Sequence, residues 1–295
     1  MEQQTSTAAR TPCVLFVARA ETRPRAALLR AAAIAASQAA SLHLVLAVGV
    51  PAKTSRMLFP QRAMDALRGR VRDEHRLALA REWAARLVPS ARIEVAQGDV
   101  STVARAAAER LGAGMLVLAA HDLAIRRDAV WLATELRIPV LVARRAAGRT
   151  TVLAATDLRN ADLPVVGTAA ALAARNHGRV VAIHNVPSAV VVPMSPYGTA
   201  RTIGASPADL RTAGERLRVA AGKRHGVTET ILAAEADTSA AVVQAAAAVA
   251  ADVVAVGARR RSWIDRLLFG SVAEGVVERC GSSVLLMPLD AAAAS

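Results

Sequence analysis

The sequence predicts an α/β protein made of two tandem, doubly wound, Rossmann-like domains, each built on a five-stranded parallel sheet. Three observations predict this fold. Short apolar runs alternate with alanine-rich helical stretches, the runs are apolar throughout, and the whole pattern occurs twice within the 295 residues. Hydrophobic residues form 54% of the chain and charged residues 21%, a composition that allows a packed core.

The internal repeat sets the expected domain organisation. TPCVLFVARAETRP, an alanine-rich segment and LHLVLAVGVP correspond to TTVLAATDLRN, an alanine-rich segment and VVAIHNVP. Farther along, GDVSTVARAAAERLGAGMLVLAA corresponds to ADTSAAVVQAAAAVAADVVAVGA. We therefore predict one domain over residues 12–147 and a second over 150–289, with the junction near Gly148.

Each copy is expected to contain five strands separated by helices. Because the apolar runs do not alternate with polar residues, the strands should be buried on both faces, as in a parallel sheet covered by helices. The expected strands lie near 12–18, 43–50, 91–96, 115–120 and 139–143 in the first copy, and near 151–156, 179–185, 228–233, 252–257 and 283–287 in the second.

Several classes of protein are excluded by composition. The longest apolar run, Thr238 to Ala251, is too short to cross a bilayer, so no membrane association is expected. The N-terminus begins with Glu2 before any basic residue and has too short an apolar core for a signal peptide, which predicts a cytoplasmic protein. Cys13 and Cys280 have no metal-ligand spacing and are expected to be small buried thiols.

The net charge of +13 is concentrated in the first half of the chain. Residues 1–149 contain 23 Lys and Arg residues against 12 Asp and Glu, whereas residues 150–295 contain 14 against 12. A basic surface can attract nucleic acid, but single-strand binding needs aromatic platforms, and aromatic residues form only 2% of the chain. Solvated helix faces explain the charge better, and a nucleic-acid partner is not expected.

The second copy has gained about seven residues near its end. Leu116 aligns with Val253 at an offset of 137 residues, whereas Val140 aligns with Val284 at an offset of 144. The additional length falls in GARRRSWIDRLLFGSV, which begins at Gly257. The first copy therefore lacks room for whatever this segment does.

An anion site is expected where this segment meets the following helix. Gly257 ends a predicted strand, and Gly270 and Ser271 precede VAEGVVERC, which is typical of a helix. Ligands of open parallel sheets bind beyond the carboxyl ends of the strands, and a helix N-terminus favours phosphate. Ser271 is also suited to an ordinary N-cap, and the two roles are compatible.

Asp157 follows the first predicted strand of the second copy. Its carboxylate is placed to accept a hydrogen bond from a ribose hydroxyl or a base amino group, or else to form an ordinary turn or helix cap. The first copy has Arg19 or Ala20 at the matching place. The copy without the long segment thus also lacks the acid, which favours a single site that includes both.

The second copy resembles a universal stress protein (UspA-type) domain, and nearly the whole chain resembles a tandem member of that family. Nucleotide-binding members carry a glycine, two residues, a second glycine, nine residues, then glycine and serine or threonine. Here Gly257, Arg260, Gly270 and Ser271 occupy these places, followed by Val272. The resemblance implies the strand order 3-2-1-4-5 and a pairing of domains, so a homo-oligomeric dimer or an internal pseudo-dimer is expected.

The resemblance also implies an adenine-nucleotide site, with ATP as the cofactor, in the second domain only. Asp157 matches the aspartate that contacts the nucleoside, and Val256 matches the residue that lies against adenine. The residues matching the phosphate-binding loop are Gly257, Arg260, Gly270, Ser271 and Val272.

Two positions depart from the family pattern. Arg260 replaces the middle glycine, where its side chain would either clamp phosphate or occupy the pocket. Asn185 stands where the family usually has an apolar residue beside the base. His184, just before it, has no ligand-spaced partner and is expected to be a hydrogen-bonded core histidine.

The function predicted from these features is a non-catalytic stress-response module that binds ATP through its second domain. No catalytic or metal-ligating residues are assigned, so hydrolysis of ATP should at most be slow. The alternative is a ligand-free, dimerising interaction scaffold whose basic first domain meets an acidic partner. A nucleotide-cleaving enzyme of the same fold is a third, weaker interpretation.

Overall fold

The computed structural model describes residues 12–49, 74, 77–121, 123–144, 150–159, 163–187, 205–222, 226–259 and 272–289. The strands of the first copy are β1 (Cys13–Arg19), β2 (Ser41–Val48), β3 (Arg92–Gln97), β4 (Met115–Ala119) and β5 (Val140–Ala143). Those of the second are β6 (Thr151–Ala155), β7 (Arg179–Asn185), β8 (Val227–Ala233), β9 (Val253–Arg259) and β10 (Ser283–Leu289). The helices are α1 (Arg25–Ser37), α3 (Val100–Leu111), α4 (Leu123–Leu136), α5 (Pro164–Arg175), α6 (Pro207–Gly222), α7 (Thr238–Ala248) and α8 (Val272–Arg279).

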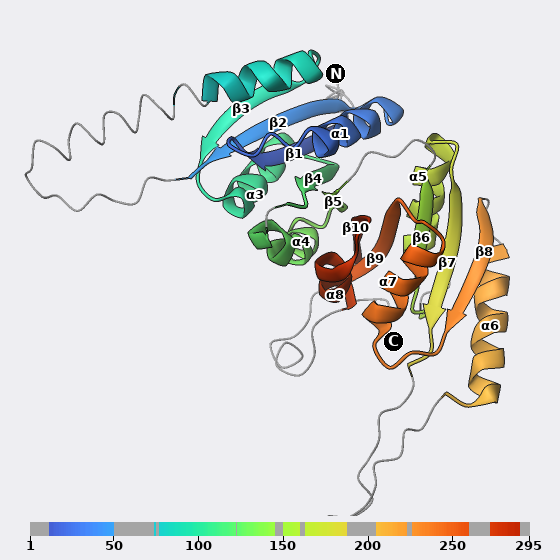
Figure 1. The fold of residues 1–295 in the computed structure, drawn as a ribbon. Coiled ribbons are helices and arrows are strands. Elements are labelled where there is room, and N and C mark those ends of the chain that lie inside the picture. Colours follow the sequence, from blue (N-terminus) through green and yellow to red (C-terminus); the bar gives the residue numbers. More distant parts are fainter. Residues whose placement is uncertain are drawn as a thin grey trace, which may run out of the picture. The chain divides into compact units, whose positions relative to one another are not determined.

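Each copy has the predicted order of strands. The first runs β3-β2-β1-β4-β5 and the second β8-β7-β6-β9-β10, which is 3-2-1-4-5 in both cases. Every observed strand boundary lies within two residues of its predicted place. The doubly wound, mostly parallel α/β fold is therefore confirmed (Figure 1).

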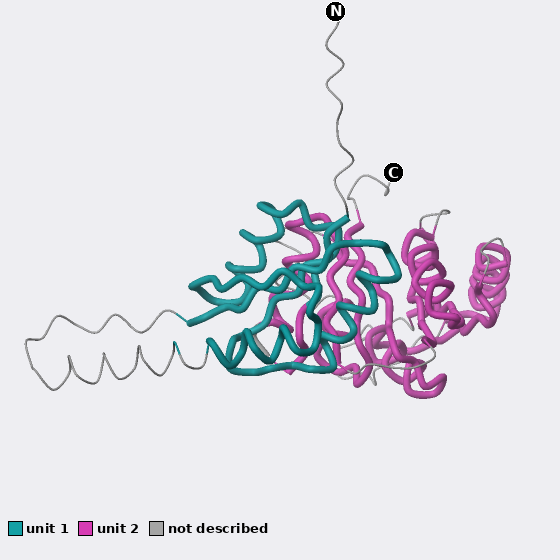
Figure 2. The backbone as a smooth tube through the Cα atoms, turned by 90° about the horizontal axis from the view of Figure 1, so that it is seen from above, with its two compact units in different colours: residues 1–117 teal, residues 118–295 magenta. Residues whose placement is uncertain are grey.

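The chain divides into two compact units, residues 1–117 and 118–295 (Figure 2). In the first unit, β2 pairs in parallel with β1 and with β3. In the second, the order is β5-β10-β9-β6-β7-β8, and β5 pairs with β10 in the antiparallel direction. β5, the last strand of the first copy, thus belongs to the same compact unit as the second copy. The domain limits 12–147 and 150–289, which come from the sequence repeat, stay a prediction.

Burial follows the lateral position of each strand. β1, β4, β5 and most of β9 are buried, as continuous apolar runs predict. β3 and β8 are not, since most of their residues are partly or fully exposed. Both are terminal strands in the order of their copies, so one edge of each has no neighbouring strand in the part of the chain that is described.

Small side chains pack the helices closely onto the sheets. The buried face of α1 includes Ala27, Ala31 and Ala35, and that of α7 includes Ala241 and Ala245. Cys13 and Cys280 are buried free thiols, as predicted. No helix among the described residues has the length and hydropathy required to cross a membrane.

An acid at the start of α7 joins that helix to α8. Asp237 is the N-cap of α7, and its Oδ1 accepts hydrogen bonds from the backbone N–H groups of Ser239 and Ala240 at 2.9 and 3.2 Å. Its Oδ2 accepts a hydrogen bond from Arg279, the last residue of α8, at 2.8 Å. The contacts from Arg279 and Ser239 hold the pKa of Asp237 well below its usual range.

We expect Asp237→Ala to lower the free energy of unfolding by about 1 kcal/mol at neutral pH, the usual effect of losing an N-cap. Because the folded state depresses the pKa of Asp237, its contribution is complete above the unfolded pKa of about 3.9 and is lost as pH falls through the lower folded value. Urea denaturation of both proteins across this pH range should therefore show a difference that shrinks on acidification.

Asp99→Ala provides the matched control for Asp237→Ala. Asp99 caps α3 at the corresponding place in the first copy, accepting a hydrogen bond from the N–H of Thr102 at 2.9 Å. The Asp99→Ala variant should lower the free energy of unfolding by an amount comparable to that of Asp237→Ala. A difference between wild type and Asp237→Ala that stays constant down to low pH would contradict the role of the charge.

Gly178 permits a close approach of two backbone segments at the start of β7. A Cβ atom at this position would lie 1.9 Å from the carbonyl oxygen of Thr150 and 2.8 Å from its carbonyl carbon. The backbone N–H of Arg179 donates to the same Thr150 oxygen at 3.1 Å, so this oxygen is held in place.

Gly178→Ala should consequently destabilise the fold by about 1–3 kcal/mol or more, because the backbone has to shift. Gly222→Ala, at the end of α6, is the control, since an added Cβ there meets nothing within 4 Å. Thermal or urea unfolding of the two variants compares them directly. Equal stabilities would show that the Thr150 segment yields easily.

Candidate functional site

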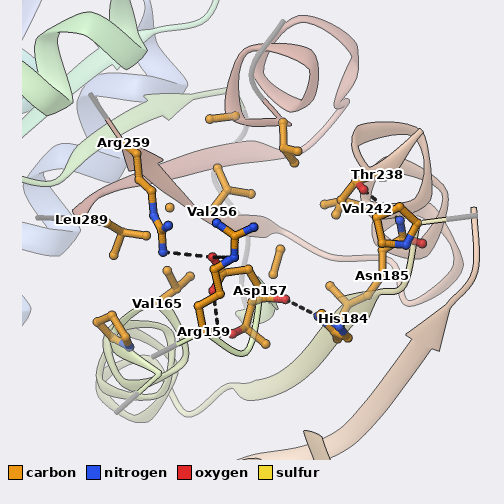
Figure 3. A pocket seen from close by; sticks show the side chains of 18 of the residues that line it. Asp157, Arg159, Val165, His184, Asn185, Thr238, Val242, Val256, Arg259 and Leu289 are labelled. Atoms are coloured by element: carbon orange, nitrogen blue, oxygen red, sulfur yellow. Dashed lines mark hydrogen bonds and ion pairs between the residues drawn. The ribbon is translucent and has the colours of Figure 1, made fainter. Parts of the chain in front are cut away.

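A cavity of about 630 Å³ opens at the carboxyl ends of β6, β7 and β9 (Figure 3). The first residues of α5, α7 and α8 also line it: Pro164, Thr238 and Val272. Its position follows from the strand order, because the connections from β6 and β9 diverge at this edge of the sheet. Helix N-termini at its wall favour a ligand with negative charge.

The wall of the cavity is partly apolar. Val256, from β9, is only 2% exposed and lines it together with Ile183, Val165 and Val242. Figure 3 shows the side chain of Val256 between those of Leu289 and Val242. This face is suited to a flat apolar group such as a nucleobase.

Asp157 lies directly beyond β6 and is engaged on both oxygens. Its Oδ1 accepts a hydrogen bond from the backbone N–H of Arg159 at 3.0 Å, which makes it a turn aspartate. Its Oδ2 accepts a hydrogen bond from Nη2 of Arg259 at 2.9 Å, and Nε of Arg159 lies 3.9 Å from the same oxygen. The turn role anticipated from the sequence is thus present, and a nucleoside contact would be additional.

Gly257 is covered by a residue of the neighbouring strand. A Cβ atom at Gly257 would lie 2.2 Å from Cδ1 of Leu289 and 3.7 Å from Cγ2 of Val165. The glycine therefore gives Leu289 room to lie over the end of β9. Leu289 also lines the cavity, so it limits access to the backbone at Gly257.

Asn185 is occupied by structural hydrogen bonds. Its Nδ2 donates to the backbone carbonyl of Glu235 at 3.0 Å and to Oγ1 of Thr238 at 2.8 Å, while its Oδ1 accepts from the N–H of Glu235 at 2.9 Å. The amide therefore fixes the connection between β8 and α7. This use explains how a polar side chain occupies a position where an apolar one was expected.

His184 also takes part in a structural contact. Its Nδ1 lies 2.8 Å from the carbonyl oxygen of Thr156, and because a carbonyl only accepts, Nδ1 carries the proton. The prediction of a hydrogen-bonded histidine is confirmed, although the side chain is half-buried and lines the cavity.

The other residues assigned from the sequence are only partly described. Val272 begins α8, lines the cavity and is 39% exposed. Arg260, Gly270 and Ser271 lie outside the described residues. Asp157, Val256, Gly257 and Val272 are brought together around one cavity, and their roles in binding stay a prediction.

The described part of the chain offers no group of three or more His, Cys, Asp or Glu residues that could hold a metal ion. The charged residues lining the cavity are Asp157, Arg159 and Arg259. Among the described residues, this arrangement can hold an anion and an apolar ring, with no carboxylate cluster beside them.

Sequence reasoning missed Arg259 and Leu289. Arg259 stands in a run of three arginines, Arg259 to Arg261, a pattern typical of a solvated surface, and β9 was expected to end at Gly257 but continues to Arg259. Residues two apart on a strand face the same side, so Arg259 shares the side of Gly257 and reaches Asp157. Leu289 gave no local signal, since it lies 32 residues after Gly257 in sequence and approaches it from the neighbouring strand β10.

Comparisons with known proteins agree with this architecture. The sequence model of the Universal stress protein family matches residues 148–288. A functionally unknown protein from Pseudomonas aeruginosa PAO1 shares the fold with a TM-score of 0.57 and 19% identity, over 95% of this chain and 93% of its own. A universal stress protein from Archaeoglobus fulgidus DSM 4304 does so with a TM-score of 0.53 and 12% identity, over 95% and 97%.

At these identities the two structures establish the fold alone. None of the curated proteins compared matches the sequence. The family match covers the second copy, which contains β6 to β10 and the cavity. Residues 148–288 of this chain, just under half of its length, are therefore similar to the universal stress protein family.

Proposed function

We propose that this protein is a cytoplasmic, non-catalytic stress-response module that binds an adenine nucleotide, ATP in particular, in the cavity of its second copy. The observation that carries the proposal is the convergence of Asp157, Val256 and the start of α8 on one cavity. An apolar wall, a carboxylate and a helix N-terminus suit the base, the ribose and the phosphates of a nucleotide in turn.

In this proposal the base lies against Val256, and Asp157 accepts a hydrogen bond from a ribose hydroxyl. The phosphates lie near Gly257 and the start of α8 at Val272, where Arg260, Gly270 and Ser271 would complete the loop. The cavity volume of about 630 Å³ falls within the usual range for small-molecule and cofactor sites.

The proposed role is binding, with hydrolysis at most slow. Phosphoryl transfer needs a group that orients the attacking water and a cation held near the phosphates. Among the described residues that line the cavity, the single carboxylate is that of Asp157, which is already engaged by the N–H of Arg159 and by Arg259. We further propose that the antiparallel pairing of β5 with β10 serves as the internal counterpart of a dimer contact.

Val272→Asp tests the position of the phosphates. Position 272 is exposed and begins α8, where an acidic side chain favours the helix, so the fold should be retained. The new carboxylate lies beside the proposed phosphate site, and we expect the dissociation constant for ATP, measured by calorimetry, to rise at least about tenfold.

Val272→Asn is the matched control, because it has the size of aspartate without its charge. It should bind ATP within about threefold of wild type. Equal weakening in both variants would contradict the electrostatic effect. Wild-type protein that gives no heat at about 1 mM ATP would overturn nucleotide binding and favour the ligand-free scaffold.

A further inference from the structure

The ion pair between Asp157 and Arg259 joins two residues that line the proposed nucleotide cavity. Arg259 is the last residue of β9, and Figure 3 shows its side chain directed at Asp157 beyond the end of β6. The bond is charge-assisted, at 2.9 Å, and the Arg259 side chain is 31% exposed. Partial burial makes it stronger than a fully solvated pair.

Arg159 belongs to the same group of charges but differs in two respects. Its Nε lies 3.9 Å from Oδ2 of Asp157, beyond hydrogen-bond distance, and its side chain is 69% exposed. An ion pair of this kind contributes little. Arg259, not Arg159, therefore controls the availability of the Asp157 carboxylate.

The described residues lining the cavity have an excess of positive charge, since two arginines face one aspartate. A neutral nucleoside that uses Asp157 for its ribose competes with Arg259 for Oδ2 of the carboxylate, and we take the case in which Arg259 is displaced. The guanidinium would then lose a charged acceptor and gain none, which is costly at a partly buried site. A phosphorylated ligand supplies a new acceptor of matching geometry.

We propose that Arg259 is a specificity-determining residue that makes a phosphate group necessary for tight binding. It exchanges Asp157 for the phosphate of the ligand, and this frees the carboxylate for the ribose. The inference rests on the proposed nucleotide function and concerns the class of ligand: phosphorylated nucleosides are accepted, and neutral nucleosides are discriminated against.

Calorimetry of the full chain with adenosine, AMP and ATP tests the exchange. In Arg259→Gln the carboxylate is free but the phosphate partner is gone. ATP should bind about tenfold more weakly and adenosine several-fold more tightly. The dissociation constant for adenosine divided by that for ATP therefore falls by about 30-fold. The gain for adenosine is decisive, because a merely damaged pocket would lose affinity for both ligands.

Arg159→Gln is the matched control and should change that ratio by less than about threefold. Arg259→Lys retains the charge without the planar fork and should give a ratio between wild type and Arg259→Gln. The lysine variant also provides the measurement if the glutamine variant does not fold, in which case a ratio unchanged from wild type overturns the inference.

The outcomes separate the two proposals. Wild-type protein that binds ATP, together with Arg259→Gln that weakens adenosine and ATP alike, overturns the role of Arg259 and leaves nucleotide binding intact. An equal effect in Arg159→Gln overturns it too, because bulk charge would then suffice. Wild-type protein that binds neither ATP nor AMP overturns both proposals.

Discussion

The pairing of β6 with β9 is the constraint on which the candidate site depends. The two strands run in parallel, with Val152 opposite Val253 and Ala154 opposite Ala255. Continuation of this register brings the residues after β6 level with the end of β9. Asp157 and Arg259, 102 residues apart in sequence, consequently meet at 2.9 Å. Where β6 and β9 pair, the connections that follow them diverge to opposite faces of the sheet. This divergence opens the cavity.

The sequence was sufficient for the central part of the fold. Where a strand has neighbours on both edges and helices on both faces, burial requires a continuous apolar run, and that signal is local. β3 and β8 show where it stops being reliable. RIEVAQ and VTETILA contain polar residues within the strand, and these are tolerated because each strand ends the order of its copy. Lateral position in a sheet depends on long-range pairing, which the local apolar pattern does not reveal.

The candidate site likewise has a part that the sequence predicts and a part that it does not. Asp157, Val256 and Gly257 could be placed at one edge because carboxyl ends of parallel strands coincide. The partners of these residues could not be predicted. Leu289 reaches Gly257 because β10 runs beside β9 in the register Met287 opposite Gly257, and its side chain leans across that contact. Packing of side chains from different strands decides which atoms a ligand can reach, and no local pattern encodes it.

The two copies differ in sequence and in loop length at the carboxyl ends of their strands. The place of Asp157 is taken by Arg19 or Ala20 in the first copy, so the carboxylate is missing at the end of the corresponding strand. The connection between β4 and α4 has three residues, whereas that between β9 and α8 has twelve. Three residues turn the chain from a strand into a helix and leave no segment to enclose a phosphate. The first copy therefore keeps the strands and helices needed for packing, while β5 extends the sheet of the second copy through β10. A framework duplicated in this way can lose one ligand site without losing its core, because the cavity lies beyond the strands and the hydrophobic packing lies between them.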